Sequence, residues 1–237
     1  MKKELITKFI EKYYLGGTIE SVVWISKDKK LGTAFTSEDK TLVGNVRMDE
    51  SEIEDSTFGI YTTSDLSKIL SIMKPDINIK LQGINDKFNS IVLSDGTFNG
   101  KFILSDTEII PKPAKLNKLP NFEMQIKIDK QFIDNFLGAK SAVDTDVFAI
   151  KSYDEKIELI MNYSTINSNN IIYNINGEST INFNPTAFSA EKVKNILVAN
   201  KNCDSGMLKI SSQGLSEYTF TEKNYQSTYY LIQLQLS

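Results

Sequence analysis

The sequence predicts an α+β protein of two successive domains, each with two helices packed on antiparallel sheets. Three observations predict this class: four segments with helical apolar periodicity, strand-like runs between them, and a proline-containing segment near mid-chain. The 237 residues, 41% hydrophobic and 24% charged, suit two small globular domains. We therefore expect an N-terminal domain at 1–104, a connector at 105–120 and a C-terminal domain at 121–237.

The first half begins with a predicted helix at 2–14, whose apolar residues recur on one face at helical spacing. A second helix is predicted at 63–73, with Thr63 or Ser64 as its N-cap and Pro75 just beyond its end. Short runs rich in β-branched and aromatic residues predict strands at 21–26, 31–35, 41–48, 57–61, 77–81, 90–94 and 98–104.

The second half repeats this order of helices and strands. Asp129 is the expected N-cap of a third helix, and Asn184 followed by Pro185 predicts the start of a fourth helix that runs towards Leu197. Strands are predicted at 122–128, 147–152, 156–163, 171–178, 207–211, 217–221 and 229–236. Because the two halves share one order of elements, we expect two domains of the same architecture.

The amino-acid composition argues against an enzyme. The chain has no histidine and a single cysteine, Cys203, which removes the commonest general base, histidine-activated nucleophiles and thiolate metal clusters. It also lacks the glycine-rich phosphate-binding motifs. The acidic stretch at 49–55 does not have the spacing of a calcium loop, and its role is left open between a solvated loop and a weak cation or partner contact. We expect no catalytic residues, no metal and no cofactor.

The charge pattern limits any contact with nucleic acid to part of the surface. The formal net charge is −3, which does not suit a protein that binds nucleic acid over its whole surface. Arg47 is the sole arginine among 27 basic residues, and lysine suits non-specific phosphate contact better than base recognition. No apolar run reaches the roughly 18–20 residues that a membrane-spanning helix needs, so no membrane contact is expected.

Several strings in the right order resemble segments of the sliding clamp of T4-type bacteriophages. The longest is the strand-then-helix segment at 58–72, FGIYTTSDLSKILSI. The segment at 105–115, with TEIIP at its centre, is similar to the extended link of that family, and DTDVFAI at 144–150 is similar to the strand after the third helix. GLSEY at 214–218, with YYLI at 229–232, resembles the last hairpin.

This resemblance implies a two-domain sliding-clamp fold that assembles as a homotrimeric ring, with helices lining the hole. Such a ring encircles double-stranded DNA without sequence specificity and acts as a processivity factor for the replicative DNA polymerase. It is opened by an ATP-driven clamp loader, and in T4-like phages it also serves late transcription. The expected location is the cytoplasm of the infected bacterial host. None of these activities requires a catalytic residue in the ring itself.

Lysines on the four predicted helices are the candidates for contact with DNA, although any surface helix can carry lysine. Lys68 is the clearest, because its helix face is expected to carry serines and no acid. The full set of candidate DNA-facing residues is Lys3, Lys8, Lys12, Lys68, Lys130, Lys140, Lys192 and Lys194.

The connector provides the candidate partner-binding residues, because clamps dock partner peptides beside it. It holds three of the five prolines, which favour an extended path, and it is more apolar than a simple linker requires. The alternative is that its apolar residues pack on a neighbouring sheet. The candidates are Ile109, Ile110, Pro111 and Leu116.

A structural β-rich protein, such as a phage tail or baseplate subunit, is the alternative from another class. The many predicted strands and the mildly acidic composition of this chain fit such a protein nearly as well. Lysine on all four predicted helices and the order of the resembling strings favour the clamp.

Overall fold

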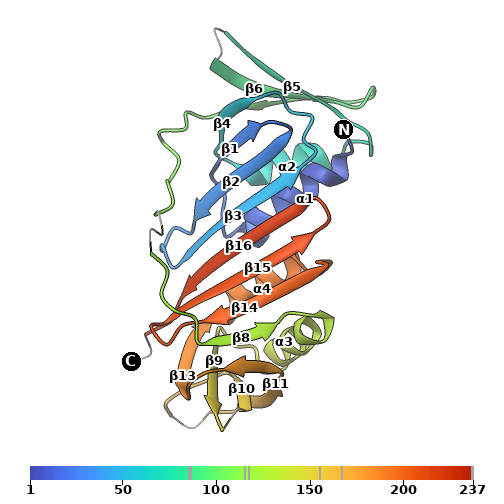
Figure 1. Ribbon diagram of the computed structural model, residues 1–237. Helices are drawn as coiled ribbons and strands as arrows, with labels where there is room; N and C mark the ends of the chain where they lie inside the picture. The colour runs from blue at the N-terminus through green and yellow to red at the C-terminus, as the bar shows by residue number, and fades with distance from the viewer. Residues whose placement is uncertain (85–86, 115, 117, 155, 167, 236–237) are drawn as a thin grey trace. The chain divides into compact units, whose positions relative to one another are not determined.

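The computed structural model describes residues 1–84, 87–114, 116, 118–154, 156–166 and 168–235. It forms two compact units, an N-terminal unit of Met1–Ala114 with Asn224–Ser227 and a C-terminal unit of Lys115–Lys223 with Thr228–Ser237. Each unit combines two α-helices with antiparallel strands, which confirms the predicted fold class (Figure 1). Within the described residues, no helix has both the length and the apolar character needed to span a membrane. Lys115 and Asn117 of the predicted connector, and Leu236 and Ser237 at the predicted end of the second domain, lie outside the described residues.

The N-terminal unit contains two sheets and two helices that contact each other. The helices are α1 (Lys3–Tyr14), which a short 3₁₀ turn (Leu15–Gly17) follows, and α2 (Thr63–Ser71). The larger sheet has the order β4-β1-β2-β3, and its strands are β1 (Val22–Lys27), β2 (Lys30–Thr36), β3 (Leu42–Asp49) and β4 (Ser56–Ile60). The smaller sheet has the order β5-β6-β7, and its strands are β5 (Asn78–Ile84), β6 (Lys87–Ser94) and β7 (Asn99–Ile103).

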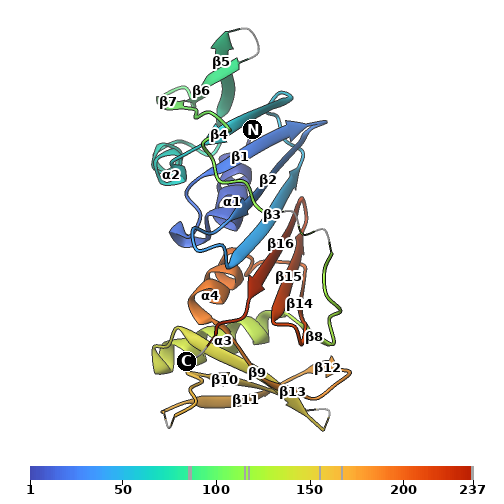
Figure 2. The ribbon, with the colours of Figure 1, turned by 90° about the vertical axis from the view of Figure 1, so that its left-hand side faces the viewer.

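An aromatic cluster fixes α1 on one face of the larger sheet. The rings of Phe9 and Trp24 pack edge to face with centroids 5.3 Å apart, and Tyr13 and Phe58 also lie against Trp24. All four side chains are buried. Edge-to-face aromatic packing adds to the gain from apolar burial, so this cluster sets the position of α1. Both α1 and α2 lie on this one side of the sheet (Figure 2).

The start of α2 differs from the prediction, because its cap comes from a distant residue. Thr62 is the N-cap residue, and its side chain makes no capping hydrogen bond. Instead, the Glu20 carboxylate accepts from the Ser64 N–H at 3.0 Å, and the Glu20 carbonyl accepts from the Thr63 N–H at 3.1 Å. The predicted capping by Thr63 or Ser64 is therefore wrong. Local sequence could not predict a carboxylate supplied from 44 residues away.

The C-terminal unit also combines two sheets with two contacting helices, α3 (Lys130–Val143) and α4 (Ala190–Ala199). One sheet has the order β12-β8-β14-β15-β16, with β8 (Met124–Lys127), β12 (Gly177–Ser179), β14 (Ser205–Ile210), β15 (Leu215–Glu222) and β16 (Tyr225–Ile232). The other has the order β11-β10-β9-β13, with β9 (Val147–Tyr153), β10 (Lys156–Met161), β11 (Ile171–Ile175) and β13 (Phe183–Ser189).

The third helix begins as predicted, whereas the fourth does not. The Asp129 carboxylate accepts from the Phe132 N–H at 2.9 Å and caps α3. Asn184 and Pro185 lie in strand β13, where the register shifts between Phe183 and Thr186. Proline fits there because β13 is an edge strand with a bulge, where its missing N–H interrupts no ladder. The fourth helix begins five residues later than predicted, at Ala190, and Ser189 is its N-cap.

Candidate functional site

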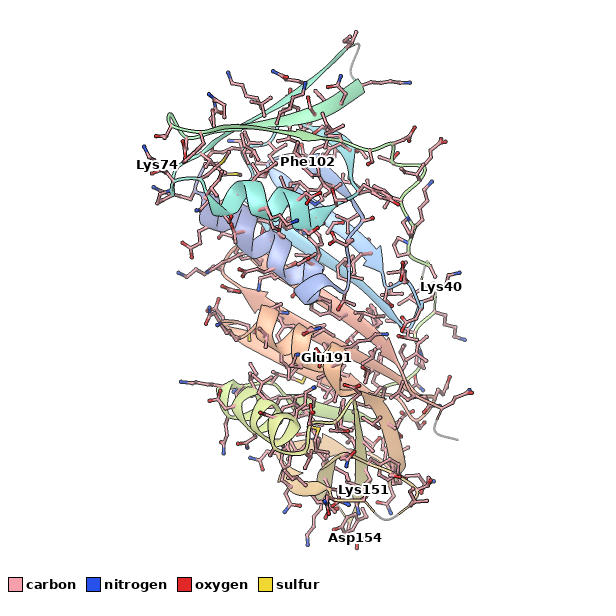
Figure 3. The ribbon with its side chains drawn as sticks, turned by 180° about the vertical axis from the view of Figure 1, so that it is seen from behind. Lys40, Lys74, Phe102, Lys151, Asp154 and Glu191 are labelled. Atoms are coloured by element: carbon pink, nitrogen blue, oxygen red, sulfur yellow. The ribbon has the colours of Figure 1, made fainter. Side chains whose placement is uncertain are left out.

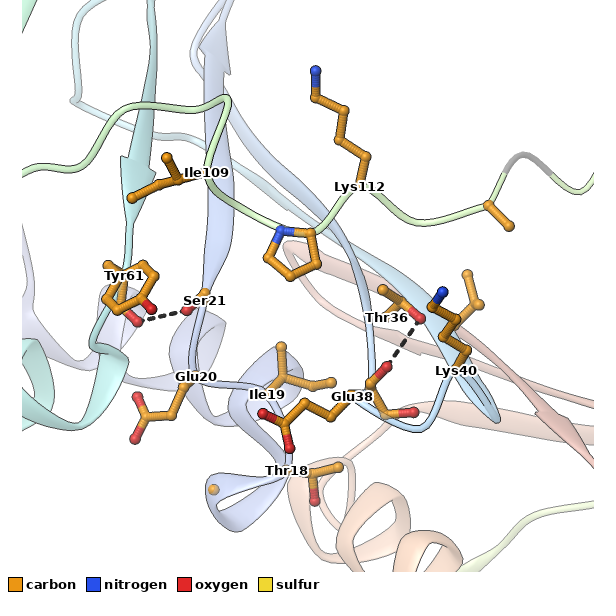
Figure 4. Close-up of a pocket in the computed structure, with 15 residues that line it drawn as sticks. Thr18, Ile19, Glu20, Ser21, Thr36, Glu38, Lys40, Tyr61, Ile109 and Lys112 are labelled. Atoms are coloured by element: carbon orange, nitrogen blue, oxygen red, sulfur yellow. Dashed lines mark hydrogen bonds between the residues drawn. The ribbon is translucent and has the colours of Figure 1, made fainter.

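A pocket of about 780 Å³ lies in the N-terminal unit, beside the connector. Its lining comes from the turn between α1 and β1, the β2–β3 hairpin, the turn between β4 and α2, and the connector (Figure 4). Its lining residues are Gly17, Thr18, Ile19, Glu20, Ser21, Thr36, Ser37, Glu38, Lys40, Val43, Tyr61, Ile109, Pro111, Lys112 and Ala114. Two of the four predicted partner-binding residues, Ile109 and Pro111, therefore lie at a pocket.

Exposed apolar side chains form one wall of this pocket. Ile109 is 61% exposed and Tyr61 is 50% exposed, and both border the cavity (Figure 4). The Ser21 hydroxyl donates to the Tyr61 carbonyl at 2.7 Å, which joins the start of β1 to the end of β4. An exposed apolar wall with a few polar groups beside it is the usual character of a protein recognition site.

Ile110 does not belong to the pocket wall. Its side chain is 3% exposed and lies against β4, so the alternative reading of this residue as core is correct. A Cβ on Gly59 would stand 2.6 Å from both Ile110 Cδ1 and the Ser105 carbonyl oxygen. The Ser105 N–H donates to the Gly59 carbonyl at 3.0 Å. Glycine at position 59 thus lets the beginning of the connector lie directly on β4.

The remaining predicted partner residue, Leu116, belongs to the C-terminal unit and is 43% exposed. It is not among the residues that line the pocket. Four charged side chains that the sequence did not single out also line the pocket. They are the acidic Glu20 and Glu38 and the basic Lys40 and Lys112. They come from three separate segments, so no local sequence pattern could have grouped them.

Lys68 is exposed on α2 but has an acidic partner. Its Nζ lies 2.9 Å from Asp65 Oδ1, one turn earlier on the helix. The expectation that this face carries no acid is therefore wrong. The hydrogen bond from Lys68 lowers the pKa of Asp65 below its usual range, and the same bond raises the pKa of Lys68. Lys130, at the start of α3, is also exposed.

The two candidates on α1 that remain partly accessible have neighbours of their own. The Lys3 ammonium donates to the Met73 carbonyl, which joins the start of α1 to the segment after α2. Lys8 Nζ lies 3.3 Å from the Glu4 carboxylate. Surface pairs of this kind contribute little to stability and are easily exchanged for other partners.

Two of the predicted DNA-facing lysines are buried. Lys12 is 2% exposed, and its ammonium lies over the Tyr225 ring, 5.5 Å from the centroid. Lys140 is 9% exposed, and its Nζ lies 2.9 Å from Glu191 Oε2. We remove both from the DNA-facing set, because each ammonium is directed to a partner inside its own unit.

Glu191 on α4 pairs with two of the candidate lysines, Lys140 and Lys194 (Figure 3). Besides Lys140, its carboxylate accepts from Lys194 on the next turn of α4, and Lys192 is half-buried. Hydrogen bonds from Lys194 and then Lys140 lower the pKa of Glu191 below its usual range. Glu191 therefore remains ionised at neutral pH and ties α3 to α4.

The acidic loop after β3 is bound to its own unit. The amino group of Met1 lies 2.9 Å from the Glu52 carboxylate, and the Asn224 side-chain amide donates to Glu50 at 2.7 Å. The Asp55 carboxylate accepts from the Asp28 N–H at 3.0 Å. Among the described residues, no group of three or more His, Cys, Asp or Glu side chains could hold a metal ion.

Comparison with known proteins identifies the fold of the chain through solved structures. No protein-family model matches the sequence, and no curated protein matches it. Many solved structures match, and three of those that match along nearly the whole chain contain proliferating cell nuclear antigen (PCNA).

The PCNA of Entamoeba histolytica matches with a TM-score of 0.75 and 15% identity, over 99% of this chain and 96% of that chain. The A. fulgidus PCNA, with the C-terminal region of FEN-1 bound, gives 0.77 and 14%, over 100% and 98%. The PCNA2–PCNA3 complex of Sulfolobus tokodaii gives 0.74 and 14%, over 98% and 97%. At these identities the likeness establishes the fold: the protein has the PCNA-like sliding-clamp fold.

Proposed function

We propose that the protein is a DNA sliding clamp, a ring subunit that encircles duplex DNA and serves as a processivity factor. The fold supports this proposal, and the distribution of charge over the four helices is the observation that carries it. In this role the protein performs no reaction of its own, because the polymerase that it tethers does the chemistry.

The helices are more positive than the chain as a whole. They carry eight lysines and five carboxylates; without the buried Lys12 and Lys140, six lysines remain against five carboxylates, a formal charge of +1, whereas the whole chain carries −3. Helices that line a ring would therefore present positive potential to the DNA while the rest of the surface stays negative. Non-specific attraction to phosphate needs charge and no fixed register, which suits a protein that slides.

Ring closure needs two different edges on each chain, and the sheets offer them. β7 is an edge of the small sheet in the N-terminal unit, and β11 is an edge of the four-stranded sheet in the C-terminal unit. Each carries an exposed isoleucine, Ile103 at 64% and Ile172 at 51% exposure. Pairing β7 of one copy with β11 of the next would cover both edges, and such a head-to-tail contact closes into a ring. We propose three copies, as in the T4-type clamps.

The pocket beside the connector is the proposed docking site for a peptide of the replicative polymerase and of the ATP-driven loader. The A. fulgidus PCNA that shares this fold is known in complex with the C-terminal region of FEN-1, so a clamp of this fold can hold a partner peptide. The sequence resemblance extends the proposal to a T4-type phage clamp that acts in an infected bacterium and serves late transcription.

Two measurements test the proposal. Light scattering should give a mass near three times 26.8 kDa at micromolar concentration. In the presence of the loader and ATP, the protein should stay on nicked circular DNA through gel filtration and should leave when the DNA is linearised. A monomer at every concentration, or equal retention on circular and linear DNA, would contradict the proposal.

A further inference from the structure

The middle of the larger N-terminal sheet, on the face away from α1, carries few large side chains, and the adjoining row on that face holds Lys27, Lys30 and Asp49. In one row across it, Ile25 stands opposite Thr57 on one side and Gly32 on the other, and Gly32 stands opposite Arg47. Because side chains alternate along a strand, these residues share a face. Ile25 is 50% exposed, and Arg47 and Thr57 are also exposed.

Gly32 leaves a notch between Ile25 and Arg47. Its backbone is not in the left-handed region, and a Cβ there would find its nearest neighbour, the Val46 carbonyl oxygen, at 3.8 Å. Neither backbone strain nor packing therefore requires glycine at this position. Glycine inside a strand weakens the strand, and it often marks a place where another backbone approaches closely.

Arg47 is the sole arginine of a chain that uses lysine at every other basic position. Its Nε lies 3.4 Å from Asp49 Oδ1, which orients the guanidinium along β3. The guanidinium fork matches a carboxylate in two parallel hydrogen bonds, which an ammonium cannot do. Arginine is also among the residues enriched at the centres of protein interfaces.

The notch and the pocket lie on the same face of the same unit. Thr36 and Val43 line the pocket and stand opposite each other in the β2–β3 register, four residues along β2 from Gly32. Four residues of strand span about 13 Å. Ala34, the residue between them on this face, is small and exposed. An extended segment that leaves the pocket can therefore reach the notch over the uncharged residues Ala34 and Asn45.

We propose that the partner segment docked in the pocket continues across this sheet face, lays its backbone over Gly32 and presents a carboxylate side chain to Arg47. Ile25 then contacts an aliphatic side chain on the other side of the notch. This inference rests on the proposed docking function of the pocket and adds a second contact with a defined chemistry. The partner class is an extended acidic-apolar protein segment.

Fluorescence anisotropy with two synthetic peptides tests the proposal on the whole protein. Each peptide of about twelve residues is long enough to span pocket and notch. Each peptide carries a Leu-Phe anchor near one end, small polar spacers in the middle, and either a Glu pair or a Lys pair near the other end. Each is synthesised in two versions, with the anchor at the N-terminal or at the C-terminal end. The Glu peptide should bind the wild-type protein about ten-fold more tightly than the Lys peptide, a difference of about 1.4 kcal/mol.

Variants assign that preference to the notch. Arg47→Gln should abolish the preference for the Glu peptide, and Arg47→Lys should lose most of it because the fork is gone. Gly32→Val should weaken the Glu peptide while leaving the melting temperature unchanged or higher, since the site has room for a side chain and valine favours strands. Equal affinity of the two peptides for the wild type, or a preference that survives Arg47→Gln, would overturn the proposal.

Two controls separate this inference from the docking function itself. Ile109→Ser should weaken both peptides equally, because it acts on the anchor. If neither peptide binds the wild type, the docking function of the pocket fails and the inference falls with it. If the anchor binds without any charge preference, the inference alone fails. If Arg47→Gln instead weakens a single-stranded oligonucleotide and leaves the Glu peptide unchanged, Arg47 contacts phosphate and the proposed carboxylate contact is wrong.

Discussion

Lys68 and Asp65 form an ion pair on the exposed surface of α2, with 2.9 Å between Nζ and Oδ1. The pair lies on one of the helices proposed to line the DNA channel, so the lysine's positive charge is partly neutralised where DNA would pass. Both side chains are well exposed, and an exposed pair of this kind readily exchanges one partner for another. A phosphate can therefore compete with Asp65 for the ammonium.

Opposite changes at this pair should have opposite effects on DNA. Lys68→Gln should reduce retention on circular DNA, and Asp65→Asn should increase it, with no change in the mass of the assembly. The slope of log K against log salt is negative, and each lost phosphate contact reduces its magnitude by about 0.9. A ring that loses three contacts should therefore show a slope whose magnitude is about 2.7 smaller. A salt titration of DNA retention checks this. Retention that is the same in both variants would exclude α2 from the DNA channel.

Ile109 and Ile110 provide a matched pair of substitutions in the connector. Ile110 is buried against β4, so Ile110→Ser should lower the free energy of unfolding by about 2–4 kcal/mol. Ile109 is exposed at the pocket, so Ile109→Ser should leave stability within about 0.5 kcal/mol of wild type and weaken polymerase stimulation. Chemical denaturation and a primer-extension assay measure the two effects. The reverse assignment of the two residues would contradict the pocket described above.

The sequence predicted elements well wherever local pattern decides the structure. The apolar periodicity of α1 and the Asp129 cap of α3 are examples, because both depend on residues within one or two turns. Predictions failed where a distant partner decides. Lys12 is buried because Tyr225 covers it, and Lys140 because Glu191 pairs with it, and both partners lie far along the chain.

For the candidate site too, the sequence predicted what local position decides and missed what distant packing decides. Position in the connector was enough to single out Ile109 and Pro111, but only the packing of Ile110 against Gly59 separates it from its neighbour. Tyr61 follows β4 and Glu38 lies in the turn between β2 and β3, so their grouping at the pocket needs the sheet register. The prediction that a helix begins at Asn184-Pro185 was wrong, because a proline that suits the first turn of a helix also suits a bulged edge strand.

Glu191 should give the C-terminal unit a pH-dependent contribution to stability. Glu191→Gln leaves the largely buried Lys140 ammonium without its carboxylate, which should cost about 1–2 kcal/mol at neutral pH, a figure reduced because Glu191 is partly exposed. The folded pKa of Glu191 lies below its usual value, so this contribution is present above about pH 4.3 and is lost as the pH falls through the folded pKa.

Denaturation of wild type and Glu191→Gln between neutral and acidic pH measures that contribution. The difference in stability should shrink steadily below about pH 4. The double variant Glu191→Gln with Lys140→Met provides the control, because it removes the buried charge together with its partner and should be more stable than Glu191→Gln alone. A difference that stays constant down to the acid limit would show that Glu191 contributes through packing and not through its charge.

Ile103 on β7 and Ile172 on β11 should decide whether the ring closes. In a head-to-tail ring every interface uses β7 of one chain and β11 of the next, so Ile103→Lys or Ile172→Lys alone damages all interfaces and should give monomers. An equimolar mixture of the two variants contains one undamaged combination, β7 of the Ile172→Lys chain with β11 of the Ile103→Lys chain. The mixture should therefore form dimers of twice 26.8 kDa and no closed trimer, and these dimers should not be retained on circular DNA.

Sedimentation of each variant and of the mixture measures this directly. A symmetric contact, in which the same edge meets itself, predicts instead that mixing restores nothing beyond what each variant forms alone, and that result would exclude the proposed pairing of β7 with β11.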